Sequence, residues 1–372
     1  MTDRLASLMH GEAETLDIPA PPAAEILGAG RRMQHRRTLV RGAAGVAVLA
    51  VAATTVGVLT LGGGGNATDT GPAAGSTPDL AYGVGDTVYV GQHATPVRMP
   101  EVAQTLYYTS AGVLVRTNKD GSSDGGAPFH FELVGTDGTT SEMGVTLRDV
   151  VPSTDPAQPY LAWATMTDGR IRVVVHDVST DRDVARVDVP GTFSWGGWEA
   201  PPVALSGDEV YVGTDDATTV VDWRTGKATT TATIPSSTLP EVEGGRTVVI
   251  RGGEQSAATA DVVDVATGED VMDIPITSET QVQLSPDGRF AMTSGYAPTG
   301  TSRVMVYDLA TSQAVQLPGP AAYGWTTDGS LYQVHGSTLT FCEPTTAACR
   351  DLTVPRVSTD ALVRYAGFAF ES

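Results

Sequence analysis

The chain has 372 residues, of which 42 are Gly and 23 are Pro, and 6% are aromatic. With Val and Thr recurring between them, this composition favours many short strands joined by tight turns over a helical protein. The formal charge is −20; residues 1–41 carry six Arg and five acidic residues, which leaves a net charge of −21 for the remainder. A surface this acidic repels phosphate backbones, so nucleic acid is excluded as a partner of the large C-terminal part.

The first 41 residues are expected to form a partly helical tail. Thr2 or Asp3 can cap a short helix that runs to about residue 14, before the prolines around position 20 break it. One narrow apolar stripe of this helix is formed by Leu5, Leu8 and Met9. Two interpretations stay open: a solvated tail whose arginines fix topology, or a docking peptide whose stripe contacts a cytoplasmic protein.

Residues 42–61 form a twenty-residue run without a charge, rich in Val, Ala and Leu. At about 1.5 Å per residue, a helix of this length spans roughly 30 Å, the thickness of a hydrocarbon core. Five arginines crowd its N-terminal flank: Arg31, Arg32, Arg36, Arg37 and Arg41. The next basic residue after the run is Arg98, so the positive-inside rule predicts a single-pass membrane protein with residues 1–41 in the cytoplasm and the large domain outside.

A cleaved export signal is the alternative, because residues 36–40 (Arg-Arg-Thr-Leu-Val) match a twin-arginine motif ahead of an apolar stretch. The apolar run is longer than is usual for such a signal, and no clear Ala-x-Ala site follows it. Both interpretations export the same domain. Residues 62–79, rich in Gly, Ser, Thr and Pro, are expected to be a flexible linker.

A Pro-rich element at residues 17–21 (Asp-Ile-Pro-Ala-Pro) precedes the arginines and the apolar run. In this arrangement the N-terminal segment resembles that of actinobacterial membrane-anchored propeller proteins. Such proteins are often encoded beside sigma factors of the extracytoplasmic-function class. The resemblance therefore implies a sigma factor as a cytoplasmic partner, although the tail lacks the His-x3-Cys-x2-Cys pattern of zinc-containing anti-sigma domains.

A repeat of about forty residues organises the rest of the chain. Tight polar turns follow an apolar strand and recur with Gly-to-Gly steps of 38, 37, 44 and 41 residues. They lie at residues 167–170, 206–209, 243–246, 286–289 and 327–330. Each period contains a second turn, at residues 177–181, 222–226, 264–268 and 308–312. Two hairpin turns per period predict four strands per unit, which is the blade of a propeller.

The same pattern extends to both ends of residues 80–372, which are expected to form one all-β, extracytoplasmic β-propeller after the transmembrane helix. Turns at residues 110–113 and 135–138 supply a blade with an inserted loop, and residues 84–87 open a shortened first blade. Residues 356–370 can pair with that first blade and close the ring. Seven blades are then expected, or six if the first segment is not a true blade. The repeat resembles WD40-like and TolB-like bacterial propellers, without their Trp-Asp dipeptide.

Cys342 and Cys349 flank the second turn of the last period and are expected to pair across a hairpin as a structural disulfide. Closing so short a loop stabilises the fold by about 2.5 kcal/mol in the chain-entropy model. Two thiols without neighbouring His or Cys do not complete a zinc site, so no metal and no cofactor are expected.

Residues 193–198 (Phe-Ser-Trp-Gly-Gly-Trp) lie between two periods, where aromatic side chains on a loop are common binding anchors. Phe193, Trp195 and Trp198 are therefore a candidate binding loop, with packing between blades as the alternative. The sequence contains no Gly-x-Ser-x-Gly elbow, His-Glu-x-x-His helix or phosphate-binding loop.

The sequence thus predicts a non-enzymatic binding or sensing propeller tethered to the cell membrane, with a protein or small-molecule ligand outside. The alternative is an exported propeller enzyme, such as a glycan- or cofactor-using hydrolase or lyase. Its acidic residues would gather at the central channel from separate blades, which sequence spacing cannot reveal.

Overall fold

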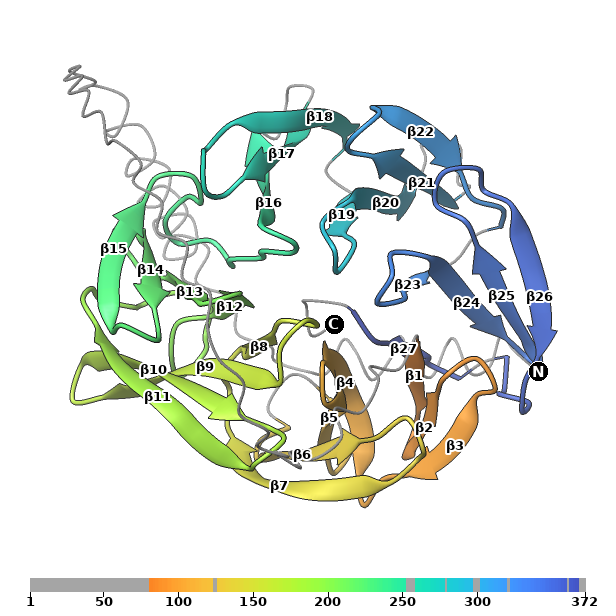
Figure 1. The fold of residues 1–372 in the computed structure, drawn as a ribbon, viewed down its shortest axis with the longest axis horizontal. Helices are drawn as coiled ribbons and strands as arrows, with labels where there is room; N and C mark the ends of the chain where they lie inside the picture. Colours follow the sequence, from red (N-terminus) through yellow and green to blue (C-terminus); the bar gives the residue numbers. More distant parts are fainter. Residues whose placement is uncertain are drawn as a thin grey trace, which may run out of the picture. The chain divides into compact units, whose positions relative to one another are not determined.

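The computed structural model describes residues 80–122, 126–251, 258–277, 280–296, 302–319, 322–359 and 361–367. In this part of the chain, 27 strands form seven antiparallel sheets, so the all-β, seven-bladed propeller is confirmed. Figure 1 shows the sheets arranged around a central axis, with one strand of each sheet innermost. The tail, the predicted membrane span and the linker (residues 1–79) lie outside the described residues.

The first three blades follow the chain from the closing strand onward. Blade 1 has the order β27 (Arg364–Tyr365), β1 (Ala81–Val84), β2 (Thr87–Val90) and β3 (Thr95–Arg98). Blade 2 consists of β4 (Val102–Thr109), β5 (Gly112–Asn118), β6 (Phe129–Val134) and β7 (Thr140–Leu147). Blade 3 consists of β8 (Ser153–Thr154), β9 (Tyr160–Thr167), β10 (Arg170–Asp177) and β11 (Arg182–Val189).

The remaining blades repeat this plan, with one exception. Blade 4 consists of β12 (Val203–Ser206), β13 (Glu209–Gly213), β14 (Thr218–Asp222) and β15 (Lys227–Thr231). Blade 5 has three strands, β16 (Arg246–Arg251), β17 (Ala258–Asp264) and β18 (Asp270–Ile276). Blade 6 consists of β19 (Gln281–Leu284), β20 (Phe290–Tyr296), β21 (Ser302–Asp308) and β22 (Gln313–Gln316). Blade 7 consists of β23 (Gly324–Trp325), β24 (Leu331–His335), β25 (Thr338–Cys342) and β26 (Cys349–Thr353).

The ring closes as the sequence predicts, because a strand from the C-terminal end pairs with the first blade. Tyr365 lies opposite Tyr82, and Arg364 lies opposite Gly83. The Tyr332 hydroxyl of blade 7 donates a hydrogen bond to the Ala81 carbonyl at 2.5 Å, which links the two blades on either side of the closure. This pairing removes the free strand edge that an open ring would leave at β1.

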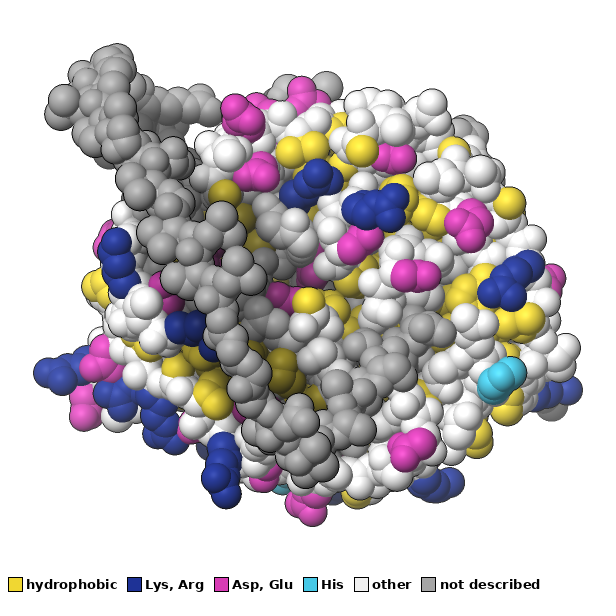
Figure 2. All heavy atoms as spheres, viewed as in Figure 1, with side chains coloured by type: hydrophobic (Ala, Val, Ile, Leu, Met, Phe, Trp, Pro, Cys, Tyr) yellow, Lys and Arg dark blue, Asp and Glu magenta, His cyan; other side chains and the backbone are white. Residues whose placement is uncertain are grey.

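The cores lie between neighbouring blades, where the alternating apolar side chains of facing sheets meet. The largest cluster joins blades 2, 3 and 4 and includes Phe131, Trp163 and Val212. A smaller one joins blades 5 and 6 through residues such as Val262 and Leu284. On the face shown in Figure 2, acidic, basic and apolar side chains are interspersed over the described residues.

A buried histidine connects blades 2 and 3. In β10, the His176 ring nitrogens lie 2.9 Å from an Asp183 carboxylate oxygen and 3.1 Å from one of Asp181. The same Asp181 oxygen accepts the Gly144 backbone N–H of β7 at 2.9 Å. Both imidazole nitrogens thus face carboxylates, and the Asp181 carboxylate also binds the backbone of blade 2.

No helix that is long and apolar enough to cross a bilayer occurs within residues 80–367, as far as these are described. The predicted span at residues 42–61 is outside that part and stays a prediction.

Candidate functional site

A small pocket lies at the axis of the propeller. Its walls come from six blades: β4, β8 and β12, the segment before β16, the turn after β19 and the segment after β27. Neighbouring blades share a face, but residues from six blades can meet only near the centre of the ring, so this lining places the pocket on the axis. The centres of water molecules can occupy about 30 Å³ of it, which is room for roughly two or three waters or one small polar group.

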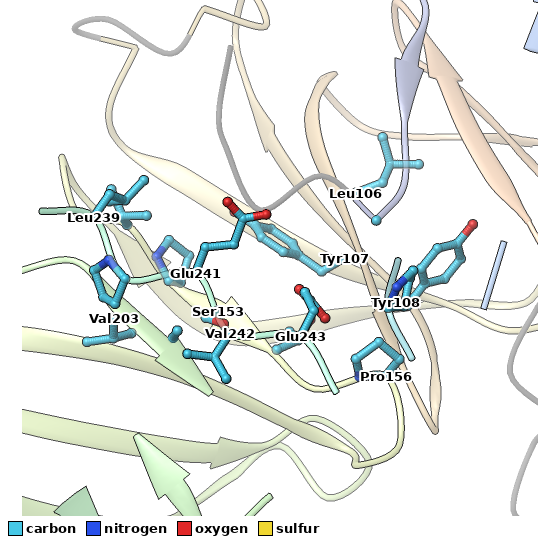
Figure 3. A pocket seen from close by; sticks show the side chains of 17 residues that line it. Leu106, Tyr107, Tyr108, Ser153, Pro156, Val203, Leu239, Glu241, Val242 and Glu243 are labelled. Atoms are coloured by element: carbon cyan, nitrogen blue, oxygen red, sulfur yellow. The ribbon is translucent and has the colours of Figure 1, made fainter. Parts of the chain in front are cut away.

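Two glutamates, Glu241 and Glu243, line this pocket, and both come from the segment that replaces an inner strand in blade 5. Pro240 has no backbone N–H to donate to a strand ladder, and only Glu243 pairs with β16, by a single bridge to Arg246. Glu243 and Arg246 exchange backbone hydrogen bonds of 2.9 and 3.0 Å. Figure 3 shows both glutamate side chains extending into the space beside Tyr107 and Tyr108.

A glycine fixes the turn that follows Glu243. Gly244 has a φ of +54°, which L side chains rarely adopt. A Cβ at this position would lie 2.2 Å from the carbonyl oxygen of Asp287 in the next blade. The turn therefore packs directly on blade 6, and this contact holds the two glutamates at the axis.

The electrostatic environment disfavours the charged form of both carboxyl groups. Burial raises the pKa of Glu241 to about 7, although the Leu284 backbone N–H opposes this shift. Burial, followed by the charges of Glu241 and Asp155, raises the pKa of Glu243 well above its usual range. Both residues keep some surface open to solvent. They nevertheless lie inside the ring among protein atoms, which favours the neutral form of a carboxyl group.

The other acidic and hydroxyl groups of this region differ in whether they have hydrogen-bond partners. The Asp155 carboxylate accepts backbone N–H groups from Ala157 and Gly207, each at 2.8 Å. The Ser153 hydroxyl accepts the Leu205 N–H at 2.9 Å. Thr154 is 9% exposed and also lines the pocket, but its hydroxyl has no hydrogen-bond partner among the described residues.

A buried cation lies on β5, the strand that pairs with β4. Arg116 of β5 is fully buried and donates to the carbonyl oxygens of Val150 and Arg148 at 3.3 and 3.4 Å. Its guanidinium also lies 3.7 Å from the centre of the Phe129 ring. Burial raises the pKa of Tyr107, and the charge of Arg116 opposes this rise. Tyr107, which lines the pocket, therefore stays a neutral phenol.

This arrangement can accept hydrogen bonds, balance a positive charge, or hold and release a proton near neutral pH. The described residues contain no group of three or more His, Cys, Asp or Glu side chains placed to hold a metal ion.

The predicted aromatic loop is found between β11 and β12, and the structure brings its three side chains together. The rings of Phe193 and Trp195 lie 5.4 Å apart, and those of Trp195 and Trp198 lie 5.6 Å apart, both edge to face. Phe193 is buried, while the two tryptophans are half-buried against the core of blades 2 to 4. The loop is thus largely a packing element, and its binding role stays a prediction.

The predicted disulfide is confirmed. Cys342 and Cys349 lie directly opposite each other on β25 and β26 and are bonded. The residues predicted for topology and docking lie outside the described residues: Leu5, Leu8, Met9, Arg31, Arg32, Arg36, Arg37 and Arg41.

Glu241 and Glu243 were not singled out from the sequence, although a signal for them exists. When the repeats are aligned on their first turn, Glu241 falls where blade 4 has Ala204. An acidic residue at the place of a buried inner-strand position is unusual. A repeat alignment that looked for such departures would have singled out Glu241, although not the residues from other blades that line the pocket with it.

Comparison with known protein families finds no match, and comparison with curated protein sequences finds none either. Similar solved structures include TolB from Acinetobacter baumannii, with 12% identity and a TM-score of 0.41 over 77% of this chain and 65% of that one. The Swd1 β-propeller domain from Myceliophteria thermophila has 12% identity and a TM-score of 0.42 over 74% and 90%. A 6-phosphogluconolactonase candidate from Bacteroides fragilis has 13% identity and a TM-score of 0.45 over 77% and 98%. At this level the likeness concerns the fold and carries nothing about activity.

Proposed function

We propose that the chain is a non-enzymatic, membrane-tethered propeller that binds a ligand outside the cell at its axial pocket. The observation that carries the proposal is the convergence of two carboxyl groups on one small pocket where six blades meet. Its lining includes no Lys, Arg or His. Both carboxyl groups have a raised pKa and no basic side chain beside them in the wall, so a ligand that brings a positive charge would stabilise their ionised form.

A ligand screen by thermal shift on the full chain tests this function. A ligand should raise the melting temperature of the wild type and should do so much less in the double variant E241Q/E243Q. The matched control is E269Q, an exposed glutamate in the turn between β17 and β18. Ligands that stabilise the wild type and the double variant equally would place binding elsewhere and contradict the proposal.

The inward half of the proposal concerns the tail. We propose that residues 1–41 contact a cytoplasmic protein, with a sigma factor of the extracytoplasmic-function class as the first candidate. The support is the apolar stripe of Leu5, Leu8 and Met9 and the resemblance of the segment. Deleting residues 1–37, or changing the three stripe residues to Ser, should abolish capture of that sigma factor. Equal capture by all three chains would leave a tethered propeller without signalling.

An axial enzyme is the second candidate, and one observation favours it. A carboxyl group with a pKa of about 7, as Glu241 has, suits general acid–base catalysis at neutral pH. Screening the full chain for cleavage of glycans and peptides tests this candidate. Turnover that disappears in E241Q and persists in E269Q would replace the binding proposal with an enzyme.

A further inference from the structure

We propose that the axial pocket takes a primary ammonium group, which binds between Glu241 and Glu243 and donates a third hydrogen bond to the Thr154 hydroxyl. This inference rests on the proposed function and names the chemical class of its ligand.

The hydrogen-bonding groups of the pocket match those of a primary ammonium group. A primary ammonium has three N–H donors and no acceptor. The pocket offers two carboxylates, and the 9%-exposed Thr154 adds a hydroxyl without a partner among the described residues. Asp155 is not needed, because both of its oxygens already accept backbone N–H groups. Three acceptors thus match three donors.

The charge and the size of the pocket also fit an ammonium group. The buried guanidinium of Arg116 donates to backbone carbonyl oxygens, the part-buried one of Arg246 donates to the Gly288 carbonyl oxygen, and the lining residues include no basic side chain. A cationic ligand would supply the missing countercharge. The open volume of about 30 Å³ accommodates an ammonium group, which is about the size of one water molecule. Leu106, Val203 and Leu239 provide an apolar frame for a short alkyl chain.

A calcium ion fits the same residues less well. Calcium takes six to eight oxygen ligands, often from several carboxylates. Within the described part of the chain, no three acidic or histidine side chains gather as metal ligands. Two carboxylates and one hydroxyl satisfy an ammonium but leave a calcium ion short of protein ligands.

Binding should depend on pH, because only ionised carboxylates pair with an ammonium. Since Glu241 has a pKa of about 7 and that of Glu243 is also raised, affinity should increase as the pH rises through neutrality. The other titratable or charged groups around the pair sit on the neighbouring elements: Asp155 after β8, Tyr107 on β4, Arg116 on β5, Arg246 on β16 and Asp287 after β19. The Arg246 guanidinium donates to the Gly288 carbonyl oxygen at 2.6 Å.

The test is isothermal titration of the full chain in detergent with n-butylamine, its neutral counterpart n-butanol, and calcium chloride. We expect n-butylamine to bind at pH 8, to bind at least about tenfold more weakly at pH 5.5, and n-butanol not to bind. E243Q should weaken amine binding by about tenfold or more, since hydrogen bonds to charged groups are lost. E269Q should leave it unchanged.

Thr154→Val keeps the side-chain volume and removes only the hydroxyl, so it tests the third contact even where a glutamate variant fails to fold. We expect it to weaken n-butylamine binding about three- to tenfold. Equal binding of amine and alcohol, or amine binding that neither E243Q nor Thr154→Val alters, would overturn the inference. Calcium binding that E243Q abolishes, without amine binding, would also overturn it while leaving an axial ligand site. If no probe and no ligand from the wider screen binds in a way that depends on Glu241 and Glu243, the proposed function fails as well.

Discussion

Blades 3 and 5 are built from the same repeat but differ in their inner strands and in their role. In blade 3, β9 and β10 pair over eight residues each, and half of their side chains are buried in the core shared with its neighbours. In blade 5 the inner strand is reduced to one bridge at Glu243, and β16 is only partly buried. The regular blades therefore stabilise the ring. Blade 5 lacks the hydrogen bonds of a full inner strand, and the segment in its place brings two carboxyl groups to the axis.

The largest effect should come from blade 3. Leu161 of β9 is 1% exposed, so Leu161→Ala should lower the free energy of unfolding by about 2–5 kcal/mol through lost burial and a cavity. Val248→Ala in the partly buried β16 should lower it by about 1 kcal/mol or less. Urea denaturation of both variants measures the contrast, and similar losses would show that blade 5 is as tightly packed as blade 3.

Loss of the disulfide should have the second-largest effect on the free energy of unfolding. Because Cys342 and Cys349 close a loop with a sequence separation of 7, replacing both with Ala should destabilise the propeller by about 2.5 kcal/mol. Reducing the wild type should have the same effect, and reducing the double variant should have none. A reductant that shifts both chains equally would mean that it acts elsewhere than on the disulfide.

The histidine between blades 2 and 3 should have a smaller effect. His176→Asn can keep the Asp183 contact, because its amide reaches the Nδ1 position, but it is too short to reach Asp181, so we expect a loss of about 1–2 kcal/mol. The Gly144 amide should also exchange its hydrogen faster, because the Asp181 carboxylate that accepts its hydrogen bond loses the contact with His176. His335→Asn, at an exposed position on β24, is the control. Unchanged exchange at Gly144 in His176→Asn would show that Asp181 is held without the histidine.

Blade 5 should be recognised by the sign of its pH dependence. Folded Glu241 keeps its proton up to about pH 7, whereas the ordinary pKa is 4.5. Between these values the folded state binds more protons, so the free energy of unfolding falls as the pH rises. E241Q should remove this part of the slope and E269Q should keep it. A wild-type slope that E241Q does not change would mean that Glu241 titrates normally.

The sequence predicted those parts of the fold that depend on local chemistry. Turns such as Asp168-Gly169 require positive φ, which both residues show, and their spacing predicted four-stranded blades. The pairing of Cys342 with Cys349 followed from the same hairpin. The site could not be predicted in this way, because Glu241, Thr154 and Tyr107 are far apart in sequence and meet only when the ring closes through β27. The enzyme alternative anticipated axial acids from separate blades, whereas Glu241 and Glu243 share one segment.

Ligand binding at the axis depends most on the protonation state of Glu241 and Glu243, which a carbon-13 NMR titration of the glutamate side chains measures directly. We expect one resonance with a midpoint near pH 7 that is absent in E241Q, and a second, also raised, that is absent in E243Q. Addition of n-butylamine should lower both midpoints. Midpoints near 4.5 for every glutamate, unchanged by the amine, would contradict the account.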